Sequence, residues 1–556
     1  MVMRDFFKQA VQNIARFGDT DIFPFPVERH VFHELENDVL DLLGIMHAEF
    51  FGLKDANGDQ IKEPSLSQFP PVNVNALAQV GHAGFRSATQ LDPMWNAYLL
   101  GITLSIGDEI ERKRLPSAER SVFSYRIKGV PDDRTLFDTS ISWRDFMLES
   151  IERAGKASYV VTCDIGDFYP RVYHHRIENA VMQIAQGTDL PKRLDKLLSA
   201  FTSGGTSFGL PVGGNAARIL AELALNSTDH LLRMHQIQFC RYVDDYHLFA
   251  SSREEAFRHL IFLSEKLLAN DGLSLQKSKT RVTSAIEFAK VEQFVLGLED
   301  PVDSLKEGAG ERDIETVRFM RLHIRYDPYS DDPDGDFERT REAVEKFDVL
   351  SMLTAEVAKV HIHGTLVKQL LKAAKALSDD VLYKIVPVLL DNISSLGPVF
   401  PQLSILLKDV APRLPPVMRS QIVTHLIAAI RGGDPALQLD LHRVYALRLI
   451  ALEWTVESEA LLVELFIEPK SSPLLRRDII LVMAVWGNHH WLSDTLKNFS
   501  NFGDWERRAC IIASFRLKDE GKHWRTNRAK SFSAFERLVN KWAGQKANVA
   551  GWEVPL

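Results

Sequence analysis

Two adjacent aspartates, Asp244 and Asp245, constrain the fold of this chain more than any other feature of its sequence. The flanking residues 237–241 and 246–250 alternate in the way that β-strands do, so the pair is predicted to lie at the tip of a β-hairpin. A tight bend there directs both carboxylates outward. The plain alternative is a pair of turn-capping aspartates with no chemical role.

A third aspartate lies upstream, directly after the β-rich residues 157–163. A strand at this place would bring Asp164 to the same sheet edge as Asp244 and Asp245. Three carboxylates at one edge raise one another's pKa unless divalent cations neutralise them. Mg²⁺ is the natural occupant, with Mn²⁺ as the substitute, because it prefers oxygen ligands and shares them with substrate phosphates. A pair of such ions activates a hydroxyl and stabilises a leaving pyrophosphate, which is nucleotidyl transfer.

The order of these motifs resembles that of the reverse transcriptases. The four palm motifs of that family are matched by residues 164–169, by residues 209–214 with Leu220 and Ala221, by residues 242–245, and by residues 275–280. The match extends over about residues 80–285, and the Tyr-x-Asp-Asp box is its most specific part. The resemblance implies that Asp164, Asp244 and Asp245 are the catalytic residues that bind the metals, with the Ile165 carbonyl as a backbone ligand.

The resemblance also implies contacts with the substrate. Tyr169, next to Phe168, corresponds to the gate under the sugar that excludes a 2′-hydroxyl. Lys279 corresponds to a residue near the leaving phosphates that acts as a general acid. The alternative interpretations are a core aromatic for Tyr169 and a solvated surface lysine for Lys279.

A basic stretch at residues 111–128 is predicted to supply positive charge to a triphosphate. It holds six basic residues against two acidic ones in a chain that is acidic overall. Because Arg126 alternates with Val122 and Ser124 in a strand-like run, we expect it to contact the substrate, with Arg120 and Arg114 behind it. The alternative is a solvated basic strand or loop.

The glycine-rich residues 203–214 precede a predicted helix over residues 215–232. Glycines such as Gly213 let the backbone approach a bound substrate closely. The helix is expected to lie beneath the active site and to carry Arg218 and Glu222 as an i,i+4 ion pair. Val212 stands where template-copying relatives usually have Gln, and Ala217 where they often have Ser, so template-guided copying is in doubt.

These departures resemble one branch, the abortive-infection reverse transcriptases of the AbiK and AbiA type. Residues 18–28, the 218/222 pair and residues 505–510 and 522–524 carry the resemblance. The branch joins a fingers-palm unit to an α-helical repeat domain in place of the usual thumb. It is associated with bacterial anti-phage defence and with DNA synthesis that needs no template and begins on a protein side chain. A homo-oligomer is also expected for this chain.

The second half of the chain has apolar residues at helical spacing from Arg339 onward. The pairs Arg476-Arg477 and Arg507-Arg508 each precede an apolar helix and lie 31 residues apart. Some stacked helix-pair repeats have a period near this value, so an irregular HEAT-like solenoid is predicted, with a plain helical bundle as the alternative.

The predicted fold is therefore α+β, a right-hand polymerase palm and fingers followed by an all-α helical-repeat domain. Its expected parts are an N-terminal segment with fingers at 1–155, a palm at 156–300, a connector at 301–340 and the repeats at 341–556.

Composition and charge set the remaining bounds. Three cysteines among 556 residues build neither a disulfide framework nor a four-ligand zinc site, which fits a reducing bacterial cytoplasm. The longest apolar run, residues 479–486, is far shorter than the roughly 20 residues of a membrane span, and the N-terminus lacks a signal-peptide core. A net charge of -8 argues against a grip on long duplexes and favours local contact with short or tethered products.

Three hypotheses about activity follow. The first is a template-independent, protein-primed polymerase that takes dNTPs and leaves single-stranded DNA attached to the protein, in phage defence. The second is an RNA-templated reverse transcriptase, and the third is a catalytically silent scaffold whose repeats bind a partner. If synthesis starts on the protein, its primer is a hydroxyl, but none of the eleven tyrosines, the first of which is Tyr98, can be singled out.

Overall fold

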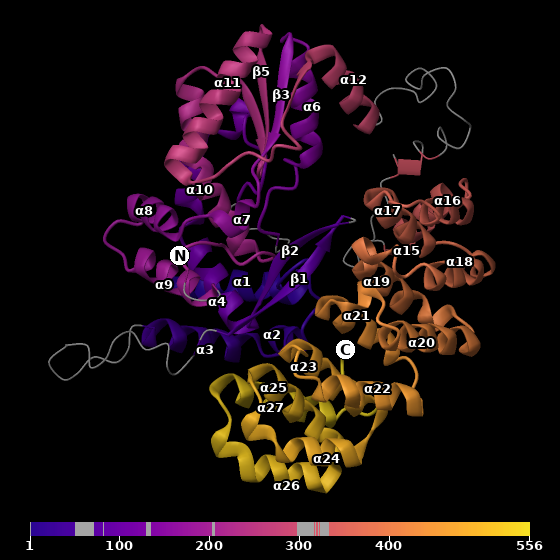
Figure 1. The fold of residues 1–556 in the computed structure, drawn as a ribbon. Coiled ribbons are helices and arrows are strands. Elements are labelled where there is room, and N and C mark those ends of the chain that lie inside the picture. Colours follow the sequence, from indigo (N-terminus) through magenta and orange to yellow (C-terminus); the bar gives the residue numbers. More distant parts are fainter. Residues whose placement is uncertain are drawn as a thin grey trace, which may run out of the picture. The chain divides into compact units, whose positions relative to one another are not determined.

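The computed structural model describes residues 2–50, 70, 72–81, 83–128, 135–202, 206–296, 316, 319–320, 322 and 333–556. Contacts divide the chain into two compact units (Figure 1). The first consists of Met1–Asn73 and Thr89–Ser304, and the second of Val74–Ala88 and Leu305–Leu556. Most of the predicted connector at 301–340 lies outside the described residues.

The first unit is built around a buried helix, α4 (Pro93–Leu104), every residue of which is buried. Its sequence is apolar all round, as expected of a helix inside a core. Asp92 caps its N-terminus by accepting a hydrogen bond from the Met94 N–H, and Pro93 occupies the first turn, where no amide donor is needed. The helix contacts α1 (Met3–Phe17), α3 (Glu36–Glu49), α9 (Leu190–Phe201) and α10 (Asn215–Met234).

A four-stranded antiparallel sheet carries the motifs of the first unit. Its strand order is β4 (Phe239–Tyr242), β5 (Asp245–Ala250), β3 (Tyr159–Asp164) and β6 (Arg281–Ser284). Helices α6 (Trp143–Ala154) and α12 (Ala285–Leu296) contact this sheet, and so does α11 (Arg253–Lys266), which lies on the other side of the strands in Figure 1. Both faces are covered, so most residues of the central strands β3 and β5 are buried. Cys163 of β3 and Cys240 of β4 are small buried fillers.

Shorter helices complete the first unit. They are α2 (Arg29–Glu34), α5 (Gly107–Lys113), α7 (Phe168–Arg171) and α8 (His174–Ile184). The strands β1 (Asn73–Val80) and β2 (Gly84–Leu91) pair with each other in a separate two-stranded sheet, most of which belongs to the second unit. In the described residues, every helix is too short or too polar to cross a membrane.

The second unit is helical after residue 333, as predicted for the C-terminal half. Its helices are α15 (Pro333–Val344), α16 (Val349–Val357), α17 (Gly364–Ala374), α18 (Asp379–Asp391), α19 (Phe400–Val410), α20 (Pro416–Arg431), α21 (Asp440–Ile450), α22 (Val456–Ile467), α23 (Pro473–Trp486), α24 (His489–Lys497), α25 (Asp504–Ala513), α26 (Lys518–Arg528) and α27 (Ala534–Ala547). The odd-numbered helices from α17 to α27 contact one another in sequence, and α16, α18, α20 and α22 form a second row. Two stacked rows of paired helices are the architecture of an α-solenoid.

The two arginine pairs of the C-terminal half begin equivalent helices, α23 and α25. Arg477 and Arg508 are both buried, and their guanidinium carbons lie 5.5 and 4.8 Å from the ring centre of Trp505. Arg477 of α23 thus packs on a ring of α25, and Arg508 of α25 also packs on a ring of α27, 5.3 Å from the ring centre of Phe535.

Candidate active site

The predicted hairpin is confirmed. Strand β4 ends at Tyr242 and β5 begins at Asp245, so Val243 and Asp244 form the turn between them. Val243 has a φ of 57°, a left-handed conformation that is unusual for a β-branched residue. A turn of this kind persists only where surrounding contacts hold it, and it determines where the two aspartates point.

The three predicted aspartates converge at one end of the sheet. Asp164, the last residue of β3, is paired in register with Asp245 of β5, and the Ile165 N–H donates to the Asp244 carbonyl over 3.1 Å. One carboxylate oxygen from each of the three residues lies within 4.8 Å of the others. Oxygen ligands at this spacing suit hard divalent cations, and the residues present fit a metal-dependent polymerase.

The pKa of Asp245 is shifted by burial and by the closeness of the three carboxylates. Burial, followed by the neighbouring Asp244 and Asp164 carboxylates, raises the pKa of Asp245 to about 7. Lys279 partly offsets this effect, and its ammonium lies 2.7 Å from a carboxylate oxygen of Asp164. This hydrogen bond is the main reason why the pKa of Lys279 is raised. A divalent cation would relieve the same repulsion more fully.

Residues 274–276 brace the end of β3. The Gln276 N–H donates to the Asp164 carbonyl over 2.7 Å, and the Gly166 N–H donates to the Ser274 carbonyl over 2.9 Å. Ile165 also forms an isolated bridge with Leu275. The fourth motif thus attaches to the first through its backbone, which is how Lys279 comes to lie on Asp164.

Tyr169 and Phe168 lie on the short helix α7. Phe168 is buried, and its ring centre lies 5.5 Å from that of Tyr169, nearly edge to face. Burial, with a smaller contribution from nearby Tyr125, raises the pKa of Tyr169 above its ordinary value. The Tyr169 carbonyl accepts a hydrogen bond of 2.9 Å from the Leu210 N–H, so the glycine-rich segment is attached to this helix.

The N-terminal segment packs on the second motif. Gly213 has a φ of 125°, and a Cβ built on it would lie 2.3 Å from the Thr20 hydroxyl oxygen. The Asn96 side-chain amide donates to the Asp19 carbonyl over 2.8 Å. Glycine is therefore required at 213 by a neighbouring chain segment, a cause independent of any substrate.

The predicted ion pair within α10 is wrong. Arg218 instead pairs with Asp21 over 2.6 Å, because the N-terminal segment lies within its reach. Glu222 faces the interior, where its carboxylate accepts hydrogen bonds from Arg114 at 2.8 Å and Arg241 at 2.9 Å. The helix surface position of Arg218 and the buried position of Glu222 keep the two side chains apart.

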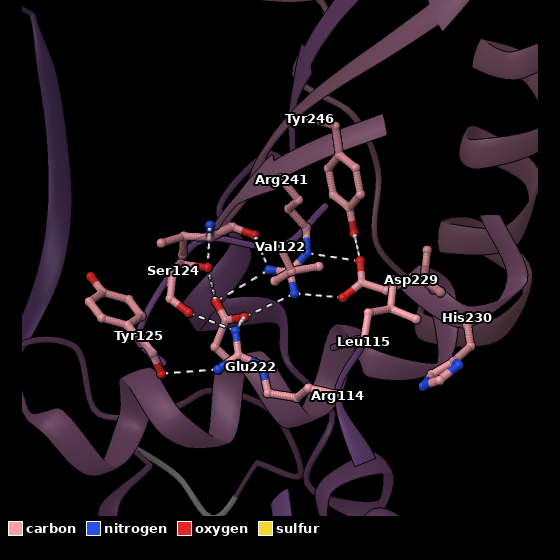
Figure 2. Close-up of polar contacts among 12 residues, drawn as sticks. Arg114, Leu115, Val122, Ser124, Tyr125, Glu222, Asp229, His230, Arg241 and Tyr246 are labelled. Atoms are coloured by element: carbon pink, nitrogen blue, oxygen red, sulfur yellow. Dashed lines mark hydrogen bonds and ion pairs between the residues drawn. The ribbon is translucent and has the colours of Figure 1, made fainter. Parts of the chain in front are cut away.

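Figure 2 shows the buried network that forms around Glu222. Arg241, fully buried, also pairs with Asp229 at 2.6 Å. Burial alone would raise the pKa of Glu222, but the charges of Arg241 and Arg114 outweigh it and leave that pKa below its ordinary value. The network is a charge-balanced core between α10 and the stretch that follows α5, and it was missed because nothing local in the sequence signals burial of these groups.

This network also holds the catalytic turn. The Val243 N–H donates to the Ser124 hydroxyl over 2.9 Å, and an Arg241 nitrogen donates to the Val243 carbonyl over 2.8 Å. The Ser124 hydroxyl in turn donates to Glu222 at 2.5 Å. Both backbone groups of the strained residue are thus satisfied by the network, so Ser124, Glu222 and Arg241 position Asp244 and Asp245.

The basic stretch does not form the predicted strand. Tyr125 has a φ of 44°, and only single bridges occur at Val122 and Ile127. Arg126 is buried, pairs with Glu111 at 2.6 Å and donates to the Leu115 carbonyl at 2.7 Å. Such contacts stabilise the fold of the stretch itself.

The three arginines of this stretch occupy different environments. Arg114 donates to the carbonyls of Ser124 and Tyr125 as well as to Glu222. Arg120 has a side chain that is 49% exposed and pairs with Glu149 at 2.5 Å. Of the three, only Arg120 presents its guanidinium to solvent. A substrate contact by any of the three arginines stays a prediction.

Residues 105–319 match the family model described as reverse transcriptase (RNA-dependent DNA polymerase). This segment is similar to the reverse transcriptases. The predicted fold class, an α+β palm and fingers followed by an all-helical region, is thereby confirmed. The predicted enzyme class, a nucleotidyltransferase, is confirmed by the same match together with the convergence of Asp164, Asp244 and Asp245.

Solved telomerase structures from yeasts are distantly similar to the chain. Telomerase from Candida albicans in complex with a TWJ fragment of telomeric RNA is 10% identical, with 82% of this chain and 68% of that one covered and a TM-score of 0.30. Apo telomerase from Candida tropicalis is 9% identical, with 71% and 72% covered and a TM-score of 0.31. Its form truncated from the C-terminal domain is 12% identical, with 43% and 60% covered and a TM-score of 0.28. No curated protein matches the chain.

Proposed function

We propose that the protein is a Mg²⁺-dependent DNA polymerase that adds deoxynucleotides without a template and begins on one of its own side chains, in bacterial anti-phage defence. Mn²⁺ is the expected substitute ion. The observation that carries the polymerase part is the convergence of three carboxylates at the strand ends of a reverse-transcriptase unit. The defence role and the protein primer rest on the resemblance to abortive-infection enzymes, which also suggests a homo-oligomer in the cytoplasm.

In this proposal the metals are held by Asp164, Asp244 and Asp245, with the Ile165 carbonyl as a further ligand. When bound, such ions lower the pKa of an attacking hydroxyl and neutralise charge on the leaving phosphates. Lys279 is protonated and donates a hydrogen bond to Asp164. In this proposal its ammonium contacts the leaving phosphates and donates a proton to them. Asp245 must lose its own proton before it can act as a ligand.

Tyr169 is the proposed selector for deoxynucleotides. Its ring is fixed on one side by Phe168, and its backbone by Leu210. A ring that cannot move aside leaves no room for a 2′-hydroxyl. A Tyr169→Ala variant should then admit ribonucleotides, whereas wild-type protein should discriminate against them.

Two features favour synthesis without a template. Val212 and Ala217 replace the Gln and Ser that template-copying relatives carry, which removes polar side chains from the second motif. The N-terminal residues Asp19 and Thr20 pack directly against Gly213 and Gly214, so part of this motif is already covered by the chain itself. The net charge of -8 agrees with short or tethered products.

The test is incubation of purified protein with labelled dNTPs and Mg²⁺, without RNA or DNA. Label that stays with the protein on a denaturing gel, and is released by nuclease, is the expected result. Asp244→Asn should reduce it at least about a thousandfold, because a lost metal ligand removes several kcal/mol of transition-state stabilisation. Asp167→Asn, an exposed aspartate three residues from Asp164, is the matched control.

A template-directed reverse transcriptase is the second candidate, and the family description favours it. It predicts that product forms only when RNA is added and that the product is complementary to that RNA. A silent scaffold is the third candidate, and it predicts no incorporation under either condition. Mass measurement of the product-bearing protein, before and after nuclease, separates attached DNA from DNA that is only bound.

A further inference from the structure

A basic cavity of about 600 Å³ lies in the first unit, away from the three aspartates, between the end of α5, the turn after it, α8 and α10. Its basic lining residues are Arg112, Lys113, Arg114, Arg176, His230 and Arg233. No carboxylate side chain occurs among the described residues that line it. In a chain with a net charge of -8, this cavity is a local concentration of positive charge.

Two arginines of the cavity form ion pairs with carboxylates that do not line it. Arg176 pairs with Asp271 at 2.7 Å, and Arg233 pairs with Glu119 at 3.2 Å. A guanidinium has five N–H donors, so each keeps donors for a ligand. Lys113 has no ion-pair partner among the described residues. Its carbonyl accepts a hydrogen bond of 2.8 Å from His230 Nε2, so the two residues lie side by side.

Polar uncharged groups lie among these charges. Asn179, Gln183, Asn226 and Ser227 contribute to the lining. The Asn226 side-chain oxygen is buried and has no hydrogen-bond partner in the described part of the chain. Since a buried acceptor without a partner costs free energy, a ligand that brings an N–H or O–H donor would be favoured there. A bare inorganic anion offers nothing for this oxygen.

We propose that this cavity binds a nucleotide unit, with its phosphates on the cationic groups and a base or sugar donor at Asn226. The volume lies within the range of small-molecule sites. The ligand chemistry is that of a phosphate ester with a nucleoside attached, either as a free nucleotide or as part of a single strand. Because Arg114 lines the cavity and also binds Glu222, the site adjoins the network that holds the catalytic turn (Figure 2).

The test measures binding without synthesis, so it succeeds or fails independently of the proposed polymerase activity. Full-length protein is titrated into fluorescein-labelled dT12 in EDTA over a series of salt concentrations. The variant Lys113→Gln/Arg233→Gln removes two exposed cations from the cavity. Lys156→Gln/Lys266→Gln removes two surface lysines elsewhere in the same unit and is the charge-matched control.

We expect the cavity variant to flatten the slope of log K against log salt by about 1.4, since each phosphate contact with a single strand contributes about 0.7. The control should keep the wild-type slope. Equal slopes for the wild type and the cavity variant, or equal flattening by the control, would overturn the proposal.

Competition identifies the form of the ligand. Displacement by dTTP at concentrations where inorganic triphosphate has no effect supports a free nucleotide, and displacement by unlabelled dT12 alone supports a strand. Equal displacement by inorganic triphosphate would refute the nucleoside part of the proposal. Asn226→Leu, which cannot accept a hydrogen bond, should weaken dTTP or dT12 several-fold while leaving the salt slope unchanged.

Discussion

At the scale of single residues, the site is defined by the protonation of Asp245. Its carboxyl shares a crowded strand end with Asp164 and Asp244, and its pKa of about 7 is well above the value of a free aspartate. The folded protein thus holds a proton there that the unfolded chain would release. Folding without metal favours the protonated form of Asp245, whereas metal binding requires the deprotonated form.

The apparent Mg²⁺ affinity should therefore depend on pH. For a group with a pKa near 7, the deprotonated fraction falls about tenfold between pH 8 and pH 6, so affinity is expected to fall about tenfold over the same interval. Calorimetric titration at the two pH values measures this. The same affinity at both would contradict a protonated Asp245 as the cause.

Asp245→Asn provides the control for this dependence. It should bind Mg²⁺ weakly at either pH, with a much smaller ratio between the two. Without metal, the wild type should lose stability as pH rises from about 4 toward 7, because the folded pKa lies above the unfolded one. Thermal unfolding in EDTA should show this loss in the wild type and much less of it in the variant.

Ser124 acts on the turn and not on the substrate. Ser124→Ala removes the acceptor of the Val243 N–H and leaves that donor without its partner, while the Glu222 oxygen loses one donor and keeps Arg241 at 3.2 Å. A loss of about 1–3 kcal/mol in the free energy of unfolding is expected. The value of kcat should fall while KM changes little, because only the aspartates are displaced.

Two further variants separate this role from general destabilisation. Ser124→Thr keeps the hydroxyl and should restore kcat in large part. Ser121→Ala removes a neighbouring hydroxyl whose contact to the Glu119 carbonyl is 3.4 Å long, and it should leave kcat unchanged. A kcat for Ser124→Ala equal to that of the wild type would exclude the positioning role.

At the scale of elements, the contact between the N-terminal segment and the second motif depends on Gly213. Gly213→Ala places a Cβ against Thr20 and imposes a φ of 125° on a residue with a side chain. A loss of more than about 1 kcal/mol is expected from the backbone conformation alone, and the clash adds to it. Chemical denaturation measures the change.

Gly272→Ala is the matched control for that variant. Gly272 also has a positive φ, 66°, but a Cβ there would meet nothing within 4 Å. It should therefore be destabilised by its backbone conformation only, and less than Gly213→Ala. If both variants lose equally, packing by Thr20 has no part in the effect.

The main helices and strands could be predicted from the sequence. The hairpin, strand β3, helix α10 and the repeated helices follow from patterns of period 2 or 3.6 that lie within a few residues of each other. Pairing of distant side chains has no such signal. Arg114 and Glu222 are 108 residues apart, and a count of charges does not distinguish a buried arginine from an exposed one. That is why the buried ion pairs of Arg114 and Arg126 and the partner of Arg218 were not predicted, and substrate contacts by Arg114 and Arg126 stay predictions.

At the scale of the whole molecule, charge sets how nucleic acid is held. The chain carries 74 acidic and 66 basic side chains, and Arg114, Arg126 and Arg241 near the site are buried in ion pairs with carboxylates. These arginines are not available to a long phosphate backbone. A protein of this kind gains affinity from a few local phosphate contacts and from stacking of bases on aromatic side chains. Unpaired bases of a single strand can stack in this way, whereas the paired bases of a duplex cannot.

Full-length protein should accordingly bind dT12 more tightly than a 12-base-pair duplex at the same salt concentration. Its slope of log K against log salt should be about −3, since the four exposed or half-exposed cations of the cavity contribute about 0.7 each. Fluorescence anisotropy with labelled single strand and duplex measures both quantities. A slope near −10, or tighter binding of the duplex, would mean that a broad basic surface binds the phosphate backbone. The ion pairs that remove arginines from the surface would then not determine which form of DNA is bound.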